Sequence, residues 1–377
     1  MQIYNLPTPA LVLDLDILNA NLKRMQDKAN QFKVSLRPHI KTHKCVEIGR
    51  RQIRLGAKGI AVSTFFEAEH FAKAGFEDIF WAFPIPFVYI SRALELAEQV
   101  RLHIVVDSLL AVDILEKACS GWRGALQVWL KIDCGYHRVG VDPESPLAEE
   151  LIHRLTRSKS LIFGGILTHA GHSYSARNRK EIVPIAEQER RAVVDFAVRM
   201  KAKNYPIPAI SIGSTPTMSV TDNLAGITEI RPGNYAFYDY TQAMLGTCSV
   251  ADCALTVMST VVSHQPAANY FVIDAGALAL SKDPGPTHVS NDMGMGVLFE
   301  DYTRKRLHAH IHLQILTQEH GKIVADSAKI IDNRFQVGDR LRILEHHACL
   351  TAAQFDRYYV VQGEEVIDEW KVLRGRM

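Results

Sequence analysis

The sequence lacks a charge imbalance: its 377 residues hold 43 Lys and Arg against 41 Asp and Glu, a formal net charge of +2. This balance gives no electrostatic basis for binding nucleic acid or a membrane surface. The chain also lacks any apolar run near the roughly 20 residues of a membrane-spanning helix, and its first residues show no secretory signal. We therefore expect a globular protein of the cytoplasm without nucleic-acid or membrane partners.

Cysteine is sparse, and its six copies follow no repeating spacing. A chain of this size does not need disulfides to hold a core, so we interpret them as free thiols in a reducing compartment. The cysteines are Cys45, Cys119, Cys134, Cys248, Cys253 and Cys349.

Short apolar segments rich in Val, Ile and Phe alternate with helical patterns through the first two thirds of the chain. Such segments are typical of strands buried on both faces, so the pattern predicts a (β/α)8 TIM barrel. A doubly wound open sheet is the alternative, but no G-x-G-x-x-G motif follows an early strand. The predicted strands are Ser35–His39, Gly59–Ser63, Asp78–Phe83, His103–Asp107, Val128–Asp133, Ile162–His169, Ala209–Gly213 and Glu229–Phe237.

Between these strands the spacing predicts amphipathic helices over Phe65–Lys73 and Lys180–Lys203. A further helix is predicted from apolar residues at helical spacing, with Asp16 as its N-cap. Those apolar residues are Leu18, Leu22, Met25 and Ala29.

Beyond about residue 245 the pattern becomes mostly β, with turns such as 283–286 between strands. We predict an α/β barrel domain over 15–245 and a C-terminal β domain over 246–377. The early strand Ala10–Asp14, within residues 1–14, is expected to join the β domain. The predicted β-domain strands are Ala254–His264, Tyr270–Asp274, Arg306–Gln314, Arg340–Leu344 and Tyr358–Gln362.

The segment Arg37–Lys44 (RPHIKTHK) is the strongest chemical signal. Lys41 follows a predicted strand and has several cationic or titratable neighbours in sequence. Like charge and desolvation favour the neutral amine, which is the form that makes Schiff bases. This chemistry indicates pyridoxal phosphate (PLP), although a basic surface loop would give the same letters.

Four further segments with suitable residue types follow later strands. In a barrel, reactive residues gather at the C-terminal ends of strands, and phosphate sites often follow strands seven and eight. A Gly-Ser-Thr turn before a helix offers backbone N–H groups, hydroxyls and a positive dipole end to a phosphate. The segments are Asp133–Arg138, His169–Tyr174, Gly213–Thr217 and Arg231–Tyr235.

Taken together, these motifs resemble the fold-type III PLP enzymes, and within them the metal-activated D-serine dehydratase and D-threonine aldolase family. The motifs are Arg-Pro-His-x-Lys-Thr-His-Lys, Asp-x-Gly-x-x-Arg-x-Gly, a strand-end Thr-His, Gly-Ser-Thr-Pro-Thr and Arg-Pro-Gly-Asn-Tyr. The resemblance covers nearly the whole chain. It implies an alanine-racemase-like barrel, a C-terminal β domain and a homodimer.

The resemblance also assigns roles residue by residue. Lys41 matches the lysine that holds PLP, Arg138 the arginine on its phenolic oxygen, and His169 the histidine stacked on its ring. Arg231 matches the arginine that faces the ring nitrogen, and Tyr174 a tyrosine near the substrate. The phosphate cup corresponds to Gly213, Ser214, Thr215, Gly233 and Asn234.

Near the C-terminus, the run Glu345–Thr351 (EHHACLT) contains a His-x-Cys pair. Alternation in a strand or extended loop would put His347 and Cys349 on one side, and imidazole plus thiolate favours zinc. The pair resembles the zinc ligands of D-serine dehydratases, whereas the aldolases tend toward His-x-Asp, which suits manganese or magnesium. The preceding Glu345 and His346 depart from the turn that relatives often have.

The resemblance implies PLP- and zinc-dependent dehydration of a D-3-hydroxy amino acid such as D-serine to a 2-oxo acid and ammonia. A metal-dependent D-threonine aldolase is the alternative, followed by a racemase and a non-catalytic PLP carrier. The sequence leaves open which D-amino acid is the substrate and which subunit completes the site. His308, His310 and His312 alternate, so a metal site and a solvated sheet face are both open for them.

Overall fold

The computed structural model describes residues 1–290 and 294–375, which divide into two compact units. The barrel unit comprises Arg24–Lys41, Ile48–Gly233 and the chain from Gly375. The β unit comprises Met1–Lys23, Thr42–Glu47 and Asn234–Arg374. The first long helix, α1 (Leu15–Gln31), contributes residues to both units.

The barrel unit contains eight parallel strands in the order β2-β9-β8-β7-β6-β5-β4-β3. A parallel bridge between His39 and Ala61 joins the chain beyond β2 to β3, so the sheet closes on itself. This confirms the predicted barrel. Most of its strands are shorter than predicted, whereas β4 and β5 are each one residue longer. The strands are β2 (Ser35–Leu36), β3 (Ile60–Val62), β4 (Asp78–Pro84), β5 (Arg101–Val106), β6 (Gln127–Lys131), β7 (Ile162–Leu167), β8 (Ile210–Ile212) and β9 (Glu229–Ile230).

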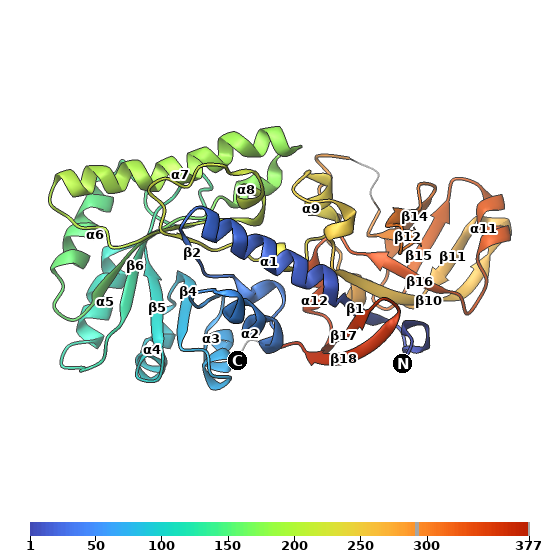
Figure 1. The fold of residues 1–377 in the computed structure, drawn as a ribbon, viewed down its shortest axis with the longest axis horizontal. Coiled ribbons are helices and arrows are strands. Elements are labelled where there is room, and N and C mark those ends of the chain that lie inside the picture. The colour runs from blue at the N-terminus through green and yellow to red at the C-terminus, as the bar shows by residue number, and fades with distance from the viewer. Residues whose placement is uncertain (291–293, 376–377) are drawn as a thin grey trace. The chain divides into compact units, whose positions relative to one another are not determined.

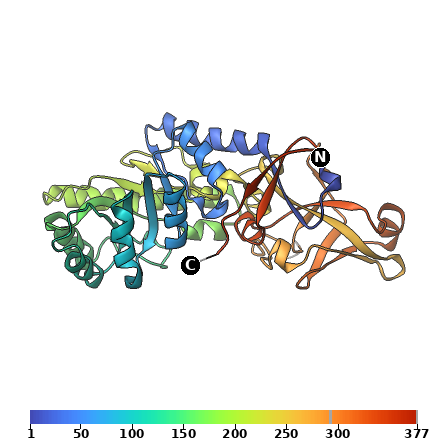
Figure 2. The same cartoon turned by 90° about the horizontal axis from the view of Figure 1, so that it is seen from below.

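Helices cover the outside of this sheet (Figures 1 and 2). The predicted helix over Phe65–Lys73 has those bounds in the structure, because Thr64 and Glu67 form a capping box at its start. The helices are α2 (Val46–Leu55), α3 (Phe65–Lys73), α4 (Ile90–Ala97), α5 (Leu109–Ala118), α6 (Pro146–Arg157), α7 (Arg179–Ala202) and α8 (Thr215–Val220).

The β unit is built on a ten-stranded sheet whose main path runs β13-β12-β16-β10-β1-β17-β18. The early strand β1 pairs with β10 and β17, as predicted for Ala10–Asp14. The strands are β1 (Ala10–Asp14), β10 (Leu255–Gln265), β11 (Tyr270–Ile273), β12 (Val297–Asp301), β13 (Arg306–Leu307), β14 (Ile311–Leu316), β15 (Gly321–Ala325), β16 (Arg340–Leu344), β17 (Arg357–Gln362) and β18 (Glu365–Lys371). Short helices lie between them: α9 (Tyr240–Met244), α10 (Ala277–Leu280), α11 (Ala328–Arg334) and α12 (Ala348–Ala352).

Two predicted strands differ from the structure in more than their end residues. The strand predicted over Glu229–Phe237 ends at Ile230, because Pro232 has no N–H to donate and the chain turns into a 3-10 helix, Asn234–Ala236. The strand predicted over Arg306–Gln314 is two strands, since β13 pairs with β12 whereas β14 pairs with β15.

The predicted N-cap of α1 is also wrong. The helix begins at Leu15, so Asp16 lies inside its first turn. The carboxylate of Asp14, the last residue of β1, instead accepts a hydrogen bond from the Ile17 N–H at 3.2 Å.

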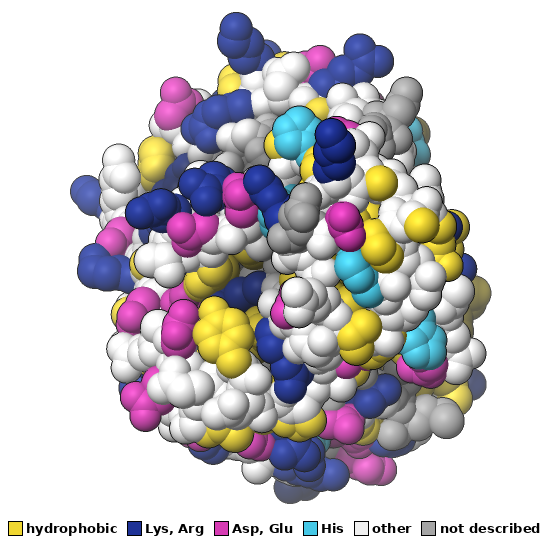
Figure 3. All heavy atoms as spheres, turned by 90° about the vertical axis from the view of Figure 1, so that its right-hand side faces the viewer, with side chains coloured by type: hydrophobic (Ala, Val, Ile, Leu, Met, Phe, Trp, Pro, Cys, Tyr) yellow, Lys and Arg dark blue, Asp and Glu magenta, His cyan; other side chains and the backbone are white. Residues whose placement is uncertain are grey.

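Charge on the molecular surface is of mixed sign. Figure 3 shows Lys and Arg side chains interspersed with Asp and Glu on one face, as the net charge of +2 leads one to expect. Within residues 1–290 and 294–375, we find no helix with the length and apolar character needed to cross a membrane.

A buried guanidinium joins three strand positions inside the barrel. Arg37, directly after β2, is 1% exposed. Its Nε donates to Glu229 of β9 at 2.8 Å, and its Nη1 pairs with Asp78 of β4. A Cβ on Gly59 would lie 2.6 Å from the Arg37 guanidinium, so only glycine permits this close approach.

Replacing Arg37 by leucine should lower the free energy of unfolding by about 3–5 kcal/mol, because the buried carboxylate of Glu229 would lose its cation and the partly buried Asp78 one of its partners. Urea unfolding at neutral pH measures this loss. Arg154→Leu is the matched control, since that arginine pairs with Asp113 at the surface and should contribute little. Equal losses in the two variants would contradict the assignment.

Candidate active site

The segment that carries Lys41 is held by backbone hydrogen bonds on two sides. The Pro38 carbonyl accepts from Ala61 N–H at 2.9 Å, and the His39 N–H donates to the Pro232 carbonyl at 3.0 Å. Lys41 follows in the short 3-10 helix Ile40–Thr42, beyond the C-terminal end of β2. Its side chain is exposed, so the desolvation expected from the sequence is not found.

The loop after β6 is organised by one carboxylate. Asp133 Oδ1 accepts the backbone N–H groups of Gly135, Tyr136 and His137, each at 3.0 Å. Burial opposes its charge, but these donors and the His137 side chain hold the Asp133 pKa below its usual range. The turn leads into Arg138, whose guanidinium carbon lies 5.0 Å from the Tyr136 ring centroid.

His169 follows β7 and is held as a neutral ring. Burial, with the positive charges of Lys41 and Lys131, lowers its pKa well below the usual value. Its Nδ1 therefore carries the proton and donates to the Gly213 carbonyl at 3.0 Å. A flat, uncharged imidazole in this place can stack on an aromatic cofactor.

The Gly213–Thr217 turn after β8 is a compact polar cradle. Gly213 has φ +129°, and a Cβ there would lie 3.0 Å from the backbone nitrogen of Arg231. The Ser214 hydroxyl caps α8 by accepting the Thr217 N–H at 3.2 Å. Ser214 and Thr215 are buried, so a phosphate in this turn would meet hydroxyls and backbone N–H groups without competing water.

Glu189, which sequence reasoning missed, anchors this cradle from α7. The fully buried carboxylate accepts Ala170 N–H at 2.8 Å, Gly213 N–H at 3.1 Å and the Thr217 hydroxyl at 2.8 Å. A glutamate at helical spacing from the buried Ala186 and Val193 was the available signal.

Arg231, just past β9, carries a buried donor without a partner. One terminal nitrogen donates to the carbonyls of Thr168 at 2.6 Å and Ser211 at 3.2 Å. Its Nε has no hydrogen-bond partner among the residues that the structure describes. Burial lowers its pKa to about 10, which still leaves the side chain charged at neutral pH. A ring nitrogen with a lone pair would satisfy this donor, so the residues fit PLP.

The remaining predicted residues of the barrel unit lie in the same connections. Because the strands are all parallel, the segments after β2, β6, β7, β8 and β9 meet at one end of the barrel. Tyr174 lies half-buried in the 3-10 helix Gly171–Ser175 after β7. Gly233 is buried at the end of the unit, whereas Asn234 begins the next segment of the β unit.

In the β unit, a helix start brings His347 and Cys349 together. The predicted alternation in a strand is wrong, because His347 is the N-cap of α12 and Cys349 lies in its first turn. The two side chains are in hydrogen-bond contact. Cys349 Sγ also lies 3.3 Å from Thr42 Oγ1 and 3.9 Å from Asn234 Nδ2.

Two aspartates that sequence reasoning missed hold this pair. Asp239 Oδ2 accepts from Asn234 Nδ2 at 2.7 Å and from Ala348 N–H at 3.1 Å. Asp283 Oδ2 accepts from His347 Nδ1 at 2.8 Å. Burial opposes the charge on His347, but Asp283 and Cys349 raise its pKa to about 11. Asp239 was recognisable from its capping spacing to Gln242, and Asp283 from the Asp-Pro-Gly turn.

The unusual Glu345 and His346 are core residues of the β unit. Glu345 is fully buried, and within residues 1–290 and 294–375 its carboxyl oxygens have no hydrogen-bond partner. Burial and the nearby Asp239 raise the Glu345 pKa well above its usual value. The His346 ring stacks on Tyr240 with centroids 5.5 Å apart.

The donor types fit a metal ion at the pair. An imidazole and a thiol are ligands that zinc prefers. Among the described residues, no group of three or more His, Cys, Asp or Glu side chains could hold a metal. His347 and Cys349 would therefore be the protein ligands, leaving other positions for small molecules.

The three alternating histidines do not share one role. His310 and His312 both pair with Asp326, at 2.9 and 3.1 Å, whereas the His308 ring packs against Phe335. Their side chains have different partners, and among the described residues no group of three or more His, Cys, Asp or Glu could hold a metal, so the three histidines do not form a three-ligand metal site.

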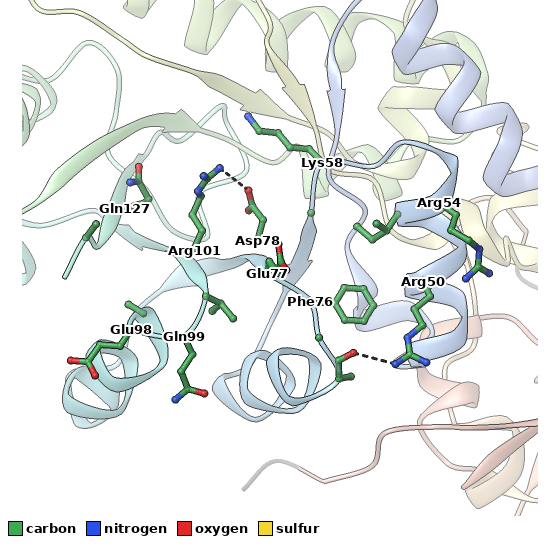
Figure 4. A pocket seen from close by; sticks show the side chains of 17 residues that line it. Arg50, Arg54, Lys58, Phe76, Glu77, Asp78, Glu98, Gln99, Arg101 and Gln127 are labelled. Atoms are coloured by element: carbon green, nitrogen blue, oxygen red, sulfur yellow. Dashed lines mark hydrogen bonds and ion pairs between the residues drawn. The ribbon is translucent and has the colours of Figure 1, made fainter.

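A separate pocket of about 890 Å³ lies at the opposite end of the barrel strands (Figure 4). Lys58, Arg101, Glu77 and Asp78 supply charges of both signs to its lining, and Arg101 pairs with Asp78 at 3.7 Å. It lies at the N-terminal ends of β4 and β5, away from the segments described above.

Both units match models of known protein families. Residues 13–241 match the family model for the alanine racemase N-terminal domain, and residues 254–361 match that for a serine dehydratase domain. The chain is 37% identical to D-threo-3-hydroxyaspartate dehydratase of Delftia sp. (strain HT23), over 99% of both chains. It is 34% identical to D-serine dehydratase of Dictyostelium discoideum, over 98% of this chain and 97% of the relative.

A solved structure and an aldolase complete the comparison. A D-threo-3-hydroxyaspartate dehydratase mutant in the metal-free form matches with a TM-score of 0.94 and 36% identity, over 100% of both chains. A D-threonine aldolase from Arthrobacter sp. is 28% identical over 97% of this chain and 92% of its own length.

The neutral state of His169 predicts a pH dependence of stability. An unfolded histidine takes up a proton near about pH 6.5, but folded His169, with its lowered pKa, resists protonation. Its contribution is present above the unfolded pKa and is lost as pH falls toward the folded pKa. His169→Phe keeps a flat ring without titrating, so it should flatten the fall in unfolding free energy between about pH 7 and 5. Urea unfolding across that range measures it, and an unchanged pH dependence would refute it.

Proposed function

Because the chain belongs to the fold-type III PLP-dependent family that includes D-serine dehydratases and D-threonine aldolases, we propose that it dehydrates a D-3-hydroxy amino acid. The products are a 2-oxo acid and ammonia. The imidazole and thiol of His347 and Cys349 at the start of α12 are the observation that carries this proposal. Such a pair prefers zinc, and zinc suits removal of a hydroxyl group.

Residues of the barrel unit would hold PLP. Lys41 would bind the cofactor aldehyde, His169 would stack on the ring, Arg138 would meet the phenolic oxygen and Arg231 would donate to the ring nitrogen. When bound, PLP supplies an electron sink for the substrate carbon that loses its proton. The unpartnered Arg231 Nε and the neutral His169 ring support these assignments. The resemblance assigns the phosphate cup to Gly213, Ser214, Thr215 and Gly233 of the barrel unit, and to Asn234, the first residue of a β-unit segment.

Two side chains act on the substrate. Lys41, once its amine is free and neutral, takes the α-proton, and Tyr174 faces the substrate. His347 and Cys349 would hold the metal ion, and the chemistry it would supply there is Lewis-acid polarisation of the departing hydroxyl. We assign the metal as zinc, with manganese or magnesium as alternatives.

The alternative is a metal-dependent D-threonine aldolase that forms glycine and an aldehyde. The similarity to the Arthrobacter aldolase supports it, since the two reactions need nearly the same residues. Cys349 favours dehydration, because a thiolate is a softer ligand than the carboxylate expected in the aldolases. A racemase would leave the metal pair unused, and a PLP carrier would leave the β unit without a role.

Assembly and location remain proposals of the same kind. We propose a homodimer of the cytoplasm, with a small D-amino acid as its substrate. The family resemblance supports the dimer, and six cysteines without disulfides support a reducing compartment.

Product identity tests the reaction type. With PLP-loaded protein and added zinc, D-threonine and D-allo-threonine should give 2-oxobutanoate and ammonia, and a chelator should abolish both. Mass spectrometry and an ammonia assay measure the products. Glycine and acetaldehyde would establish the aldolase instead.

Cys349→Ala should retain PLP absorbance but lose metal-dependent turnover, because the soft ligand is removed while the barrel unit is unchanged. Absorbance spectra and chelator-sensitive activity measure the two properties. Cys248→Ala, which removes another half-buried thiol, is the matched control. Undiminished activity in metal-free Cys349→Ala protein would exclude the proposed role.

A further inference from the structure

The loop after α10 presents a carboxylate whose two oxygens have different tasks. Asp283 Oδ1 accepts the Gly285 N–H at 2.9 Å, which closes a tight turn where Gly285 has φ +73°. Asp283 Oδ2 accepts from His347 Nδ1 at 2.8 Å. The turn therefore fixes the carboxylate, and the carboxylate fixes the imidazole.

That hydrogen bond decides which nitrogen of His347 can bind a metal. A neutral imidazole has one N–H and one lone pair, and the nitrogen facing a carboxylate keeps the proton. In the neutral ring that a metal would bind, Nδ1 is therefore the donor, and Nε2 has the lone pair. His347 is 37% exposed, so packing alone does not hold the ring in one orientation.

Two uncharged side chains also contact the proposed thiol ligand. Thr42 Oγ1 lies 3.3 Å from Cys349 Sγ, and the Asn234 amide lies 3.9 Å away. A thiolate there would meet a hydroxyl and an amide, which offer hydrogen bonds but no charge. Asp283 is hydrogen-bonded directly to the imidazole ligand, and its negative charge, with that of a thiolate, would balance a divalent cation.

We infer that Asp283 is a positioning residue that selects Nε2 of His347 as the metal ligand and strengthens metal binding. This inference rests on the proposed function, because it requires a metal at the His347–Cys349 pair. A carboxylate behind a ligating histidine raises its basicity and fixes its orientation, and losing such a partner typically weakens metal binding about 10–100-fold.

Asp283→Asn is the sharpest variant, because the amide keeps the size of the side chain and an oxygen for the Gly285 N–H. Its NH2 group then faces His347 Nδ1 and favours the tautomer that protonates Nε2. In PLP-loaded full-length protein, zinc affinity measured by competition with a chromophoric chelator should fall about 10–100-fold. With cobalt(II) in place of zinc, the ligand-field bands should shift while the thiolate-to-cobalt absorption remains.

Asp326→Asn is the matched control, since it removes a carboxylate from the His310 and His312 pair elsewhere in the β unit. Its zinc affinity and cobalt spectrum should equal those of the wild type. If Asp283→Asn protein fails to fold, Asp283→Ser restores a turn-forming oxygen and should show the same loss.

The outcomes separate the inference from the proposed function. Wild-type zinc affinity and an unchanged cobalt spectrum in Asp283→Asn, with weakened binding in His347→Ala, would overturn the positioning role alone. Wild-type zinc affinity in His347→Ala would overturn the metal assignment, and with it both proposals. Loss of the thiolate-to-cobalt absorption in Asp283→Asn would show a collapsed site, and would also overturn the positioning role.

Discussion

Arg37 carries a positive charge into the barrel interior, where it is stable because Asp78 and Glu229 face it. Glu229 also accepts from the Ser211 hydroxyl at 2.7 Å, and the Ser211 carbonyl accepts from Arg231. One buried chain of polar contacts therefore runs from β4 through the end of β2 to β9 and β8. It ends at the arginine proposed to meet the cofactor ring. The backbone positions that present Lys41 begin immediately after Arg37, so core packing and site geometry depend on the same interaction.

The orientation of His347 and Cys349 depends on other interactions, namely hydrogen bonds to two aspartates. His347 and Cys349 sit at the start of a short helix, whose own hydrogen bonds are too few to fix two ligands. Asp239 holds the backbone between them through the Ala348 N–H, and Asp283 holds the imidazole. Burial raises the Asp239 pKa, whereas the hydrogen bond from His347 lowers that of Asp283 despite partial burial. Asp239 thus holds the backbone of the His347–Cys349 segment, whereas Asp283 holds the imidazole side chain.

Sequence reasoning identified the eight barrel strands because short apolar segments at regular spacing carry a strong signal. The predicted strand bounds were wrong where they depend on which neighbouring strand a segment pairs with. The strands β12, β15 and β18 were missed, and the chain over 306–314 was read as one strand although two different neighbours divide it. Asp16 was taken as the N-cap of α1, yet the carboxylate of Asp14, where β1 ends, accepts the N–H of Ile17 in the first turn.

By itself, the sequence determined the barrel and the added β unit, and its motifs indicated the segments proposed to hold PLP and a metal, because strand patterns and dense motifs are local properties. Only the tertiary structure decided how those residues are supported. Glu189 joins the ends of β7 and β8, and Arg231 Nε finds no partner among the residues that the structure describes. Asp283 reaches His347 from 64 residues away in sequence. A buried carboxylate is recognisable only when its donors are known, and those donors come from segments that folding brings together.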